Sequence, residues 1–323
     1  VHGGGVDGLM EGAVGRERLP IGEQSPPFGR PFRRVGRGTM SKRVHGDLRL
    51  EVYGGTCATY HGGVIDQRSS GILLHPTSLP GPYGIGDLGP AALDWLDWLS
   101  NAGCRSWQVL PIGPTGYGDS PYQCFGAFAG NPYLISPDLL AADGLIERPA
   151  DPGFPDTHVD YGSVIPWKLA LLDRAFERFS TAPPADLAEE HADFKERHRS
   201  WLQDYALFMA IKEDLGGGPW WEWPPELRRG DRDAVAAAAA RLSLEVERTM
   251  FRQFLFFRQW EGLRRAAAER GIAVIGDIPI FVAPDSVDVW ANPRLFHLDE
   301  ERAMTVVAGV PPDYFSETGQ LWG

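Results

Sequence analysis

Three short apolar runs along the chain predict buried β-strands. They cover residues 71–74 (GILL), which end at His75, residues 106–110 (SWQVL), which end at Pro111, and residues 272–277 (IAVIGD). Apolar runs of this length, bounded by Gly or Pro, are typical of strands whose two faces are both covered. The third run differs from the others because it ends on a carboxylate, Asp277.

A helix is predicted between the first two strands. Pro90 suits the first helical position, Leu93, Leu96 and Leu99 recur at a spacing of three, and Gly103 suits the position just after the helix. Strand, helix and strand within about forty residues form a βαβ unit, so we expect the two strands to be parallel.

A long loop and a helical region separate the second strand from the third. The loop, residues 111–137, is rich in Gly, Pro, Tyr and Phe, and loops of this length in compact domains are usually functional. Residues 165–270 show helical periodicity with little strand signal, including a long Ala/Arg/Glu-rich helical region at 234–270. Apolar stripes of this helical region contain Leu172, Phe176 and Phe179, and then Trp201, Tyr205 and Phe208 with Lys212.

The strand pattern favours an α/β fold, namely the N-terminal part of a TIM (β/α)₈ barrel with a large helical insertion. Only three parallel strands are predicted before Gly323, and eight close a barrel, so we expect the C-terminal strands to be missing. We expect four segments: a disordered leader at 1–68, a first βαβ unit with its loop at 69–137, a mainly helical inserted subdomain plus a barrel helix at 138–270, and the third strand with a lid loop at 271–323.

The first 66 residues differ in composition from the rest of the chain. They contain 15 of the 39 glycines and none of the 11 tryptophans, and they show neither helical nor strand periodicity. Two interpretations fit a disordered segment of this kind: a flexible tail, or upstream sequence translated ahead of the true start. The chain begins with Val1 rather than Met, which favours the second interpretation.

Charge and cysteine content narrow the class of partner. The formal net charge of −12 argues against nucleic acid or an anionic membrane as the main partner, and favours a neutral polar substrate. The three cysteines, Cys57, Cys104 and Cys124, show no metal-type spacing and are too few for a disulfide scaffold, which indicates the cytoplasm. There is no apolar run of about 18 residues and no signal-peptide pattern.

The loop after the second strand carries candidate chemistry. Tyr122 follows a proline and could stack on a sugar ring, while its hydroxyl and that of Ser120 could bind sugar hydroxyls. The alternative is a tight turn packed on the rim. Asp277 at the end of the third strand is a candidate active-site carboxylate, although a single aspartate there could also serve only to bind backbone N–H groups.

The C-terminal segment 311–323 places aromatic residues beside carboxylates and glycines, which suits a lid over a polyhydroxylated substrate. An ordinary surface loop is the alternative.

The run 220–223 (WWEW) is predicted to be a packed corner, Cys104 a core residue and His75 a rim residue with satisfied hydrogen bonds. The sequence contains no HExxH zinc motif, no P-loop and no dinucleotide fingerprint in the right context.

Taken together, these segments resemble the 4-α-glucanotransferases (amylomaltase or disproportionating enzyme) of glycoside hydrolase family 77 in the α-amylase clan. The resemblance covers about residues 69–323. The motifs that carry it are 70–89 (SGILLHPTSLPGPYGIGDLG), 106–133 (SWQVLPIGPTGYGDSPYQCFGAFAGNPY), 276–290 (GDIPIFVAPDSVDVW) and 296–323 (FHLDEERAMTVVAGVPPDYFSETGQLWG).

The resemblance implies a retaining mechanism on maltooligosaccharides and α-1,4-glucans, with a carboxylate nucleophile, a carboxylic acid/base and no cofactor or metal. A lid would exclude water so that a glucan hydroxyl accepts the transferred segment. By motif match, the residues expected to bind substrate are Ser120 and Tyr122 near the cleaved sugar, Asp277 as the first active-site aspartate, Asp313 and Gln320 on the lid, Trp322 as an acceptor platform, and Tyr117 in a secondary glucan site.

One departure from the family pattern affects the expected activity. In the family, the nucleophilic Asp, with an Arg two residues before it, lies on the fourth strand, the acid/base Glu on the fifth and a third Asp on the seventh. All of these are expected beyond Gly323, so we expect no catalytic residue in this chain and no activity from it alone. The alternative is a short protein that serves as a non-catalytic α-glucan-binding module.

Overall fold

The computed structural model describes residues 68–314 and 316–321. The leader expected at 1–68 therefore lies outside the described residues except for Arg68, and so does Trp322. Of Tyr117, the structure describes only the backbone, which lies in the 3-10 turn Tyr117–Asp119.

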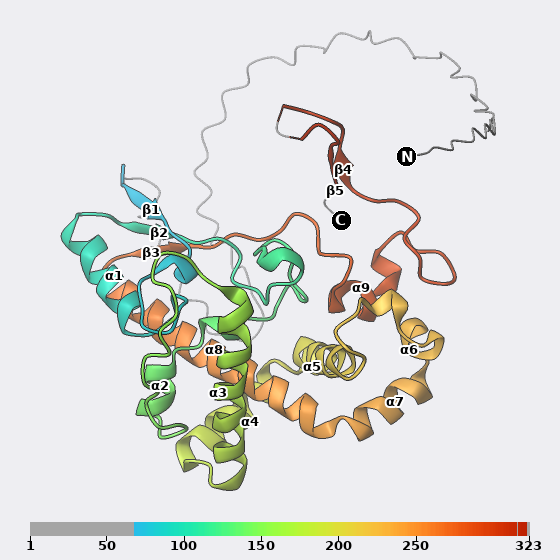
Figure 1. Cartoon of the computed structure of the whole chain (residues 1–323), viewed down its shortest axis with the longest axis horizontal. Helices are drawn as coiled ribbons and strands as arrows, with labels where there is room; N and C mark the ends of the chain where they lie inside the picture. The colour runs from blue at the N-terminus through green and yellow to red at the C-terminus, as the bar shows by residue number, and fades with distance from the viewer. Residues whose placement is uncertain (1–67, 315, 322–323) are drawn as a thin grey trace, which may run out of the picture. The chain divides into compact units, whose positions relative to one another are not determined.

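The three predicted strands form one parallel sheet. Its strands are β1 (Gly71–Leu73), β2 (Ser106–Gln108) and β3 (Ala273–Ile275), in the spatial order β1-β2-β3 (Figure 1). The regular pairing is shorter than the predicted apolar runs, but the Val109 N–H still donates to the Ile275 carbonyl at 2.9 Å. The predicted parallel α/β arrangement is therefore confirmed.

The middle strand carries the buried core of the sheet. Trp107 is completely buried and lies opposite Ile72 on one side and Val274 on the other. The outer strands are less protected, since Leu73 and Ile275 are each about half exposed.

Helices account for most of the remaining structure, as the sequence predicts. In chain order they are α1 (Pro90–Asn101), α2 (Pro137–Ala142), α3 (Tyr161–Thr181), α4 (Ala185–Arg197), α5 (Arg199–Asp214), α6 (Pro225–Arg229), α7 (Arg232–Arg241), α8 (Ser243–Glu269) and α9 (Val287–Ala291). Short 3-10 turns lie at Pro76–Ser78, Tyr117–Asp119, Pro132–Leu134, Trp220–Glu222 and Pro293–Leu295.

One detail of the predicted helices is corrected. In α1, Leu96 and Leu99 are buried as expected, but Leu93 is exposed, and Ala92 takes its place on the core face. The helical region predicted at 234–270 is formed by two helices, since α7 ends at Arg241 and α8 begins at Ser243. Gly103 does follow α1 with a left-handed φ of 75°, which a residue with a side chain adopts at a cost.

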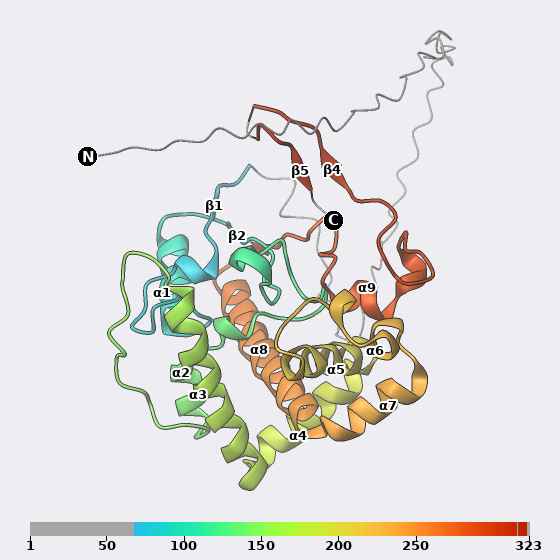
Figure 2. The ribbon, with the colours of Figure 1, turned by 45° about the vertical axis from the view of Figure 1, so that its right-hand side comes forward.

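Helix α8 is the central element of the helical region. It packs against α1, α3, α4, α5, α7 and β3, and Figure 2 shows α5 beside it. Its buried residues include Phe251, Phe254 and Phe256, and Phe251 contacts the predicted stripe of α3 through Phe176 and Phe179. Because α8 contacts both the sheet and the inserted helices, it fixes the position of these helices relative to the sheet.

Two glutamines of α8 hold the loop that follows β2, here called the β2 loop (residues 109–136). The Gln253 amide accepts from the Gly130 N–H at 2.7 Å and donates to the Gly130 carbonyl at 2.9 Å. Gln259 binds the Ser136 backbone in the same way, at 2.7 and 3.3 Å. Gly130 also lacks space for a side chain, since a Cβ there would lie 1.9 Å from the Phe256 ring.

Replacing Gln253 with leucine should lower the free energy of unfolding by about 2–4 kcal/mol, because the buried N–H and C=O of Gly130 would each lose a partner. Urea denaturation measures this change. Gln203→Leu on the exposed face of α5 is the matched control and should leave the midpoint nearly unchanged. Equal stabilities of the Gln253 and Gln203 variants would contradict this role.

The predicted lid is a small hairpin rather than an irregular loop. Strand β4 (Gly309–Val310) pairs with β5 (Gln320–Leu321) in an antiparallel register. Strands of two residues are too short to produce a visible alternation in sequence. Gly319 serves here as a fixed turn residue, because its φ is 79° and a Cβ would lie 2.5 Å from the Val310 carbonyl oxygen.

Candidate functional site

The carboxyl ends of β1, β2 and β3 lie at one edge of the sheet, because the strands are parallel. His75 follows β1, the β2 loop follows β2, and Asp277 follows β3. In parallel α/β folds, this edge is where side chains that bind substrate gather.

The structure joins two of the predicted site residues across this edge. The Tyr122 hydroxyl donates to Oδ2 of Asp277 at 2.8 Å, although the two residues are 155 positions apart in the sequence. The other carboxylate oxygen, Oδ1, accepts from the Ile278 N–H at 2.8 Å. The Tyr122–Asp277 pair is therefore an oriented carboxylate beside a tyrosine. Tyr122 is 42% exposed and Asp277 is exposed too, so both groups are accessible to a ligand.

Ser120 belongs to the same cluster through the backbone. Its hydroxyl accepts from the Tyr122 N–H at 3.4 Å, which is the turn-type contact that serine commonly makes two residues ahead. The turn is further defined by Asp119, a non-glycine residue with φ of 53°, and by a 2.6 Å hydrogen bond from the Gly116 N–H to the Gln123 carbonyl. Ser120 and Tyr122 thus form a tight turn, and the same two residues are the ones predicted to bind sugar.

Asp313 and Gln320 lie on a different element, the β4–β5 hairpin. Oδ1 of Asp313 accepts from the Ser316 N–H at 2.9 Å, and the Asp313 N–H donates to the Ser316 carbonyl at 2.9 Å. Gln320 lies in β5, opposite Val310. Between them, Tyr314 is 95% exposed.

Three further predictions concern residues outside the cluster. Trp220 and Trp223 are buried, so the tryptophan-rich run is the packed corner that we expect, with Trp221 partly exposed. Cys104 packs against the core as predicted. His75 differs from expectation, because its buried Nδ1 has no hydrogen-bond partner among the described residues and burial lowers its pKa to about 4.

The hydrogen bond to Asp277 raises the pKa of the Tyr122 phenol, because the carboxylate stabilises the protonated form, and desolvation acts in the same direction. Asp277→Asn should therefore lower this pKa towards that of a free tyrosine. Titration of the ¹³Cζ resonance of Tyr122 measures the change. An unchanged pKa would show that the pair does not form in solution.

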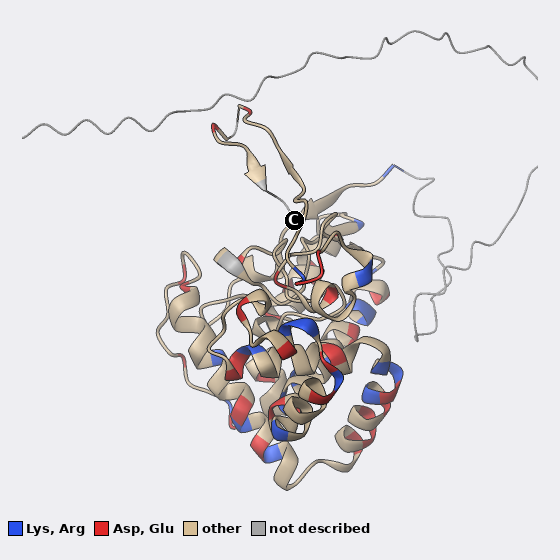
Figure 3. Ribbon diagram, turned by 90° about the vertical axis from the view of Figure 1, so that its right-hand side faces the viewer, with Lys and Arg blue, Asp and Glu red and all other residues tan. Residues whose placement is uncertain are grey.

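The electrostatics elsewhere do not indicate a charged ligand. Figure 3 shows Lys and Arg interspersed with Asp and Glu over the helices of one face. Among residues 68–314 and 316–321, no group of three or more His, Cys, Asp or Glu is placed to hold a metal ion. No helix in the described part of the chain is both long and apolar enough to cross a membrane.

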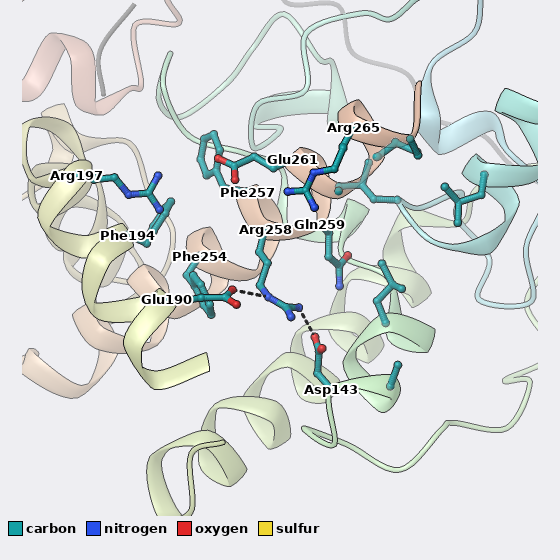
Figure 4. A pocket seen from close by; sticks show the side chains of 17 residues that line it. Asp143, Glu190, Phe194, Arg197, Phe254, Phe257, Arg258, Gln259, Glu261 and Arg265 are labelled. Atoms are coloured by element: carbon teal, nitrogen blue, oxygen red, sulfur yellow. Dashed lines mark hydrogen bonds and ion pairs between the residues drawn. The ribbon is translucent and has the colours of Figure 1, made fainter. Parts of the chain in front are cut away.

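A pocket of about 630 Å³ lies between α2, α4 and α8, away from the strand ends (Figure 4). Its polar centre is Arg258, which donates to Glu190 at 2.8 Å and to Asp143 at 2.6 Å. These ion pairs join three helices and leave the guanidinium neutralised, so we interpret this pocket as a structural junction.

Sequence reasoning missed the residues that position the β2 loop. Gln253 and Gln259 are buried polar residues on α8, six positions apart and therefore about 120° apart around the helix axis. A glutamine within an otherwise apolar stretch was the available signal, since a buried amide requires partners.

Comparison with known proteins finds a family that covers most of the chain. A model of the family described as 4-alpha-glucanotransferase matches residues 74–323. The 4-alpha-glucanotransferase of Thermus thermophilus is 57% identical over 256 residues, covering 79% of this chain and 51% of the relative. The chloroplastic/amyloplastic 4-alpha-glucanotransferase of Solanum tuberosum is 42% identical over 265 residues, covering 80% of this chain and 46% of the relative.

A solved structure is also similar. The amylomaltase from Streptococcus agalactiae in complex with acarbose superposes with a TM-score of 0.75 at 39% identity, covering 80% of this chain and 52% of that one. The chain spans about half the length of the curated relatives it matches. With a family model over residues 74–323 and relatives this similar, the chain belongs to the 4-alpha-glucanotransferase family.

Proposed function

We propose that residues 74–323 provide the glucan-binding part of a 4-α-glucanotransferase, which moves a segment of an α-1,4-glucan to another glucan or to glucose. The observation that carries this proposal is the Tyr122–Asp277 pair at the carboxyl edge of the sheet. An accessible aromatic ring beside an oriented carboxylate suits a sugar, whose C–H face stacks on the ring and whose hydroxyls donate to the carboxylate.

The proposed reaction is a retaining double displacement. A carboxylate nucleophile forms a bond to the anomeric carbon while a carboxylic acid protonates the leaving glycosidic oxygen. The acceptor's hydroxyl then attacks the same carbon, its proton passes to the acid/base residue, and the nucleophile is released. By the family resemblance both carboxylates belong beyond Gly323, and the described residues bind and orient the sugar.

Within this mechanism Tyr122, Ser120 and Asp277 would hold the sugar at the cleaved bond. Asp313 and Gln320 would contact it from the hairpin when that element covers the site and excludes water. Tyr117 and Trp322 keep their proposed roles in a secondary glucan site and on the acceptor side. We further propose a cytoplasmic location, because Cys104 and Cys124 are both unpaired.

A chimera tests the proposal directly. Residues 74–323 replace the matching segment of the Thermus thermophilus relative, which supplies the remaining half, and the product is incubated with maltotriose. We expect glucose together with oligosaccharides longer than maltotriose. A folded chimera that only hydrolyses maltotriose, or leaves it unchanged, would contradict the transferase proposal.

A binding experiment on the chain alone tests the second candidate function, a non-catalytic α-glucan-binding module. The exposed Tyr122–Asp277 pair favours this candidate as well, since it can bind sugar without a nucleophile. Binding of maltoheptaose by the chain alone, together with an inactive chimera, would support the module. Transfer by the chimera would exclude it.

A further inference from the structure

A second pocket, of about 420 Å³, lies where four elements converge: the β2 loop, α5, α8 and α9. Its volume lies in the usual range of small-ligand sites, about 300–1,000 Å³. The pocket is built on different residues from the Tyr122–Asp277 pair, and neither of those two residues lines it.

The rim of this pocket is held in place by the start of α9. The Val287 N–H donates to the Phe125 carbonyl at 2.9 Å, and Oδ2 of Asp288 accepts from the Ala127 N–H at 2.9 Å. These bonds fix the β2 loop on both sides of Gly126, where a Cβ would lie 3.0 Å from the Tyr205 ring. Phe128, immediately after this anchored segment, is therefore presented by a constrained backbone.

The apolar part of the pocket is an aromatic platform. Phe128 is 62% exposed, and its ring stacks with the half-buried ring of Trp201 at a centroid distance of 6.5 Å and an interplanar angle of 28°. Phe257 and Tyr205 also line the pocket. Small-ligand sites are lined mainly by apolar and aromatic side chains, and the rings around this cavity give it such a lining.

The polar side chains of this pocket provide both hydrogen-bond acceptors and a hydrogen-bond donor. Among the described residues, no hydrogen bond or ion pair engages the carboxylate of Asp204. Asp288 has further acceptor capacity beyond its bond to Ala127. Nδ1 of His198 accepts from the Trp201 indole at 3.3 Å, so in the neutral ring the proton lies on Nε2, which can donate.

This combination selects a class of ligand. A quaternary ammonium ion would use the aromatic rings and carboxylates but would have no use for a donor. A pyranose ring uses the aromatic rings, the carboxylate acceptors and the histidine donor, because its C–H face stacks on an aromatic ring while its hydroxyls both donate and accept. The mixed chemistry around Phe128 therefore favours a sugar over a cation.

We propose that the pocket lined by Phe128, Trp201 and Asp204 binds a glucosyl unit of an α-glucan. This pocket, which we call the second site, is distinct from the Tyr122–Asp277 pair and from the glucan site proposed at Tyr117. The choice of glucan, among sugars, rests on the proposed function. Phe128 is the stacking platform, Asp204 and Asp288 accept from sugar hydroxyls, and His198 donates.

The test uses the full chain with 4-fluorophenylalanine incorporated at position 128, and separately with 3-fluorotyrosine at position 122, which keeps the Tyr122 hydroxyl and its bond to Asp277. Maltoheptaose is titrated against each protein and followed by ¹⁹F NMR. We expect a saturable shift of the signal at position 128. Asp204→Asn should weaken this binding about tenfold, as expected for a charge-assisted hydrogen bond, while the titration at position 122 stays the same.

Trp98→Ala is the matched control, because Trp98 is an exposed aromatic residue that stacks on Trp95 but lines neither pocket. This variant should titrate like the unsubstituted chain. Weakening by Trp98→Ala as strong as that by Asp204→Asn would indicate nonspecific adsorption and overturn the proposal.

The two labels separate this inference from the proposed function. A shift at position 122 without one at position 128 overturns the second site and leaves the proposed function standing. A shift at position 128 alone supports the second site and counts against the proposed role of the Tyr122–Asp277 pair. No shift at either position, or a shift at position 128 with tetramethylammonium but not with maltoheptaose, overturns the sugar assignment.

Discussion

Replacement of Asp277 with asparagine is expected to lower kcat/KM for maltotriose about a hundredfold in the active chimera. The carboxylate is held by the Tyr122 hydroxyl and by the Ile278 N–H, and asparagine can keep much of this geometry. What it loses is the negative charge, which strengthens hydrogen bonds from sugar hydroxyls and stabilises the positive charge that develops at the anomeric carbon.

Initial rates of glucose release over a range of maltotriose concentrations measure this change. Asp233→Asn, an exposed aspartate on α7, is the control for loss of one negative charge and should stay within about twofold of the parent. If the Asp277 and Asp233 variants had the same kcat/KM, Asp277 would have only a structural role at the end of β3.

Tyr122→Ala should raise the transition-state free energy by about 1–3 kcal/mol, because it removes both the stacking surface and the hydroxyl that orients Asp277. Tyr122→Phe keeps the ring and should recover a large part of this loss. Because Tyr122 is 42% exposed, neither variant should reduce the free energy of unfolding by more than about 1 kcal/mol.

A double-mutant cycle of Tyr122→Phe with Asp277→Asn isolates the hydrogen bond between the two residues. Since the residues are in direct contact, their effects on kcat/KM should not add, with an interaction energy of about 0.5–3 kcal/mol. Full transfer activity in Tyr122→Ala would contradict the placement of Tyr122 beside the cleaved sugar.

The strands and the carboxyl edge were predictable because their signals are local. A short apolar run bounded by Gly or Pro predicts a strand, and the parallel arrangement then places the β2 loop and Asp277 at the same edge. The hydrogen bond between Tyr122 and Asp277 was not predictable, since periodicity carries no information on which side chains meet across 155 positions.

Other features depend on tertiary contacts that composition does not encode. Leu93 fits the helical spacing but is exposed, because Ala92, Leu96 and Leu99 form the face of α1 that is buried. The aromatic platform at Phe128 was also missed, since its partner Trp201 lies on α5 and nothing near Phe128 in sequence indicates it.

The contacts of β3 have a consequence for the order of folding. The bond between Tyr122 and Asp277 closes a segment of 155 residues, and closing a flexible loop of that length costs about 4.5 kcal/mol in chain entropy. Helix α8 packs against both β3 and the inserted helices, so forming those helices first shortens the effective loop before β3 joins β2. We therefore expect the Tyr122–Asp277 pair to be among the last contacts to form as the chain folds, so that its appearance marks the completion of folding rather than its beginning.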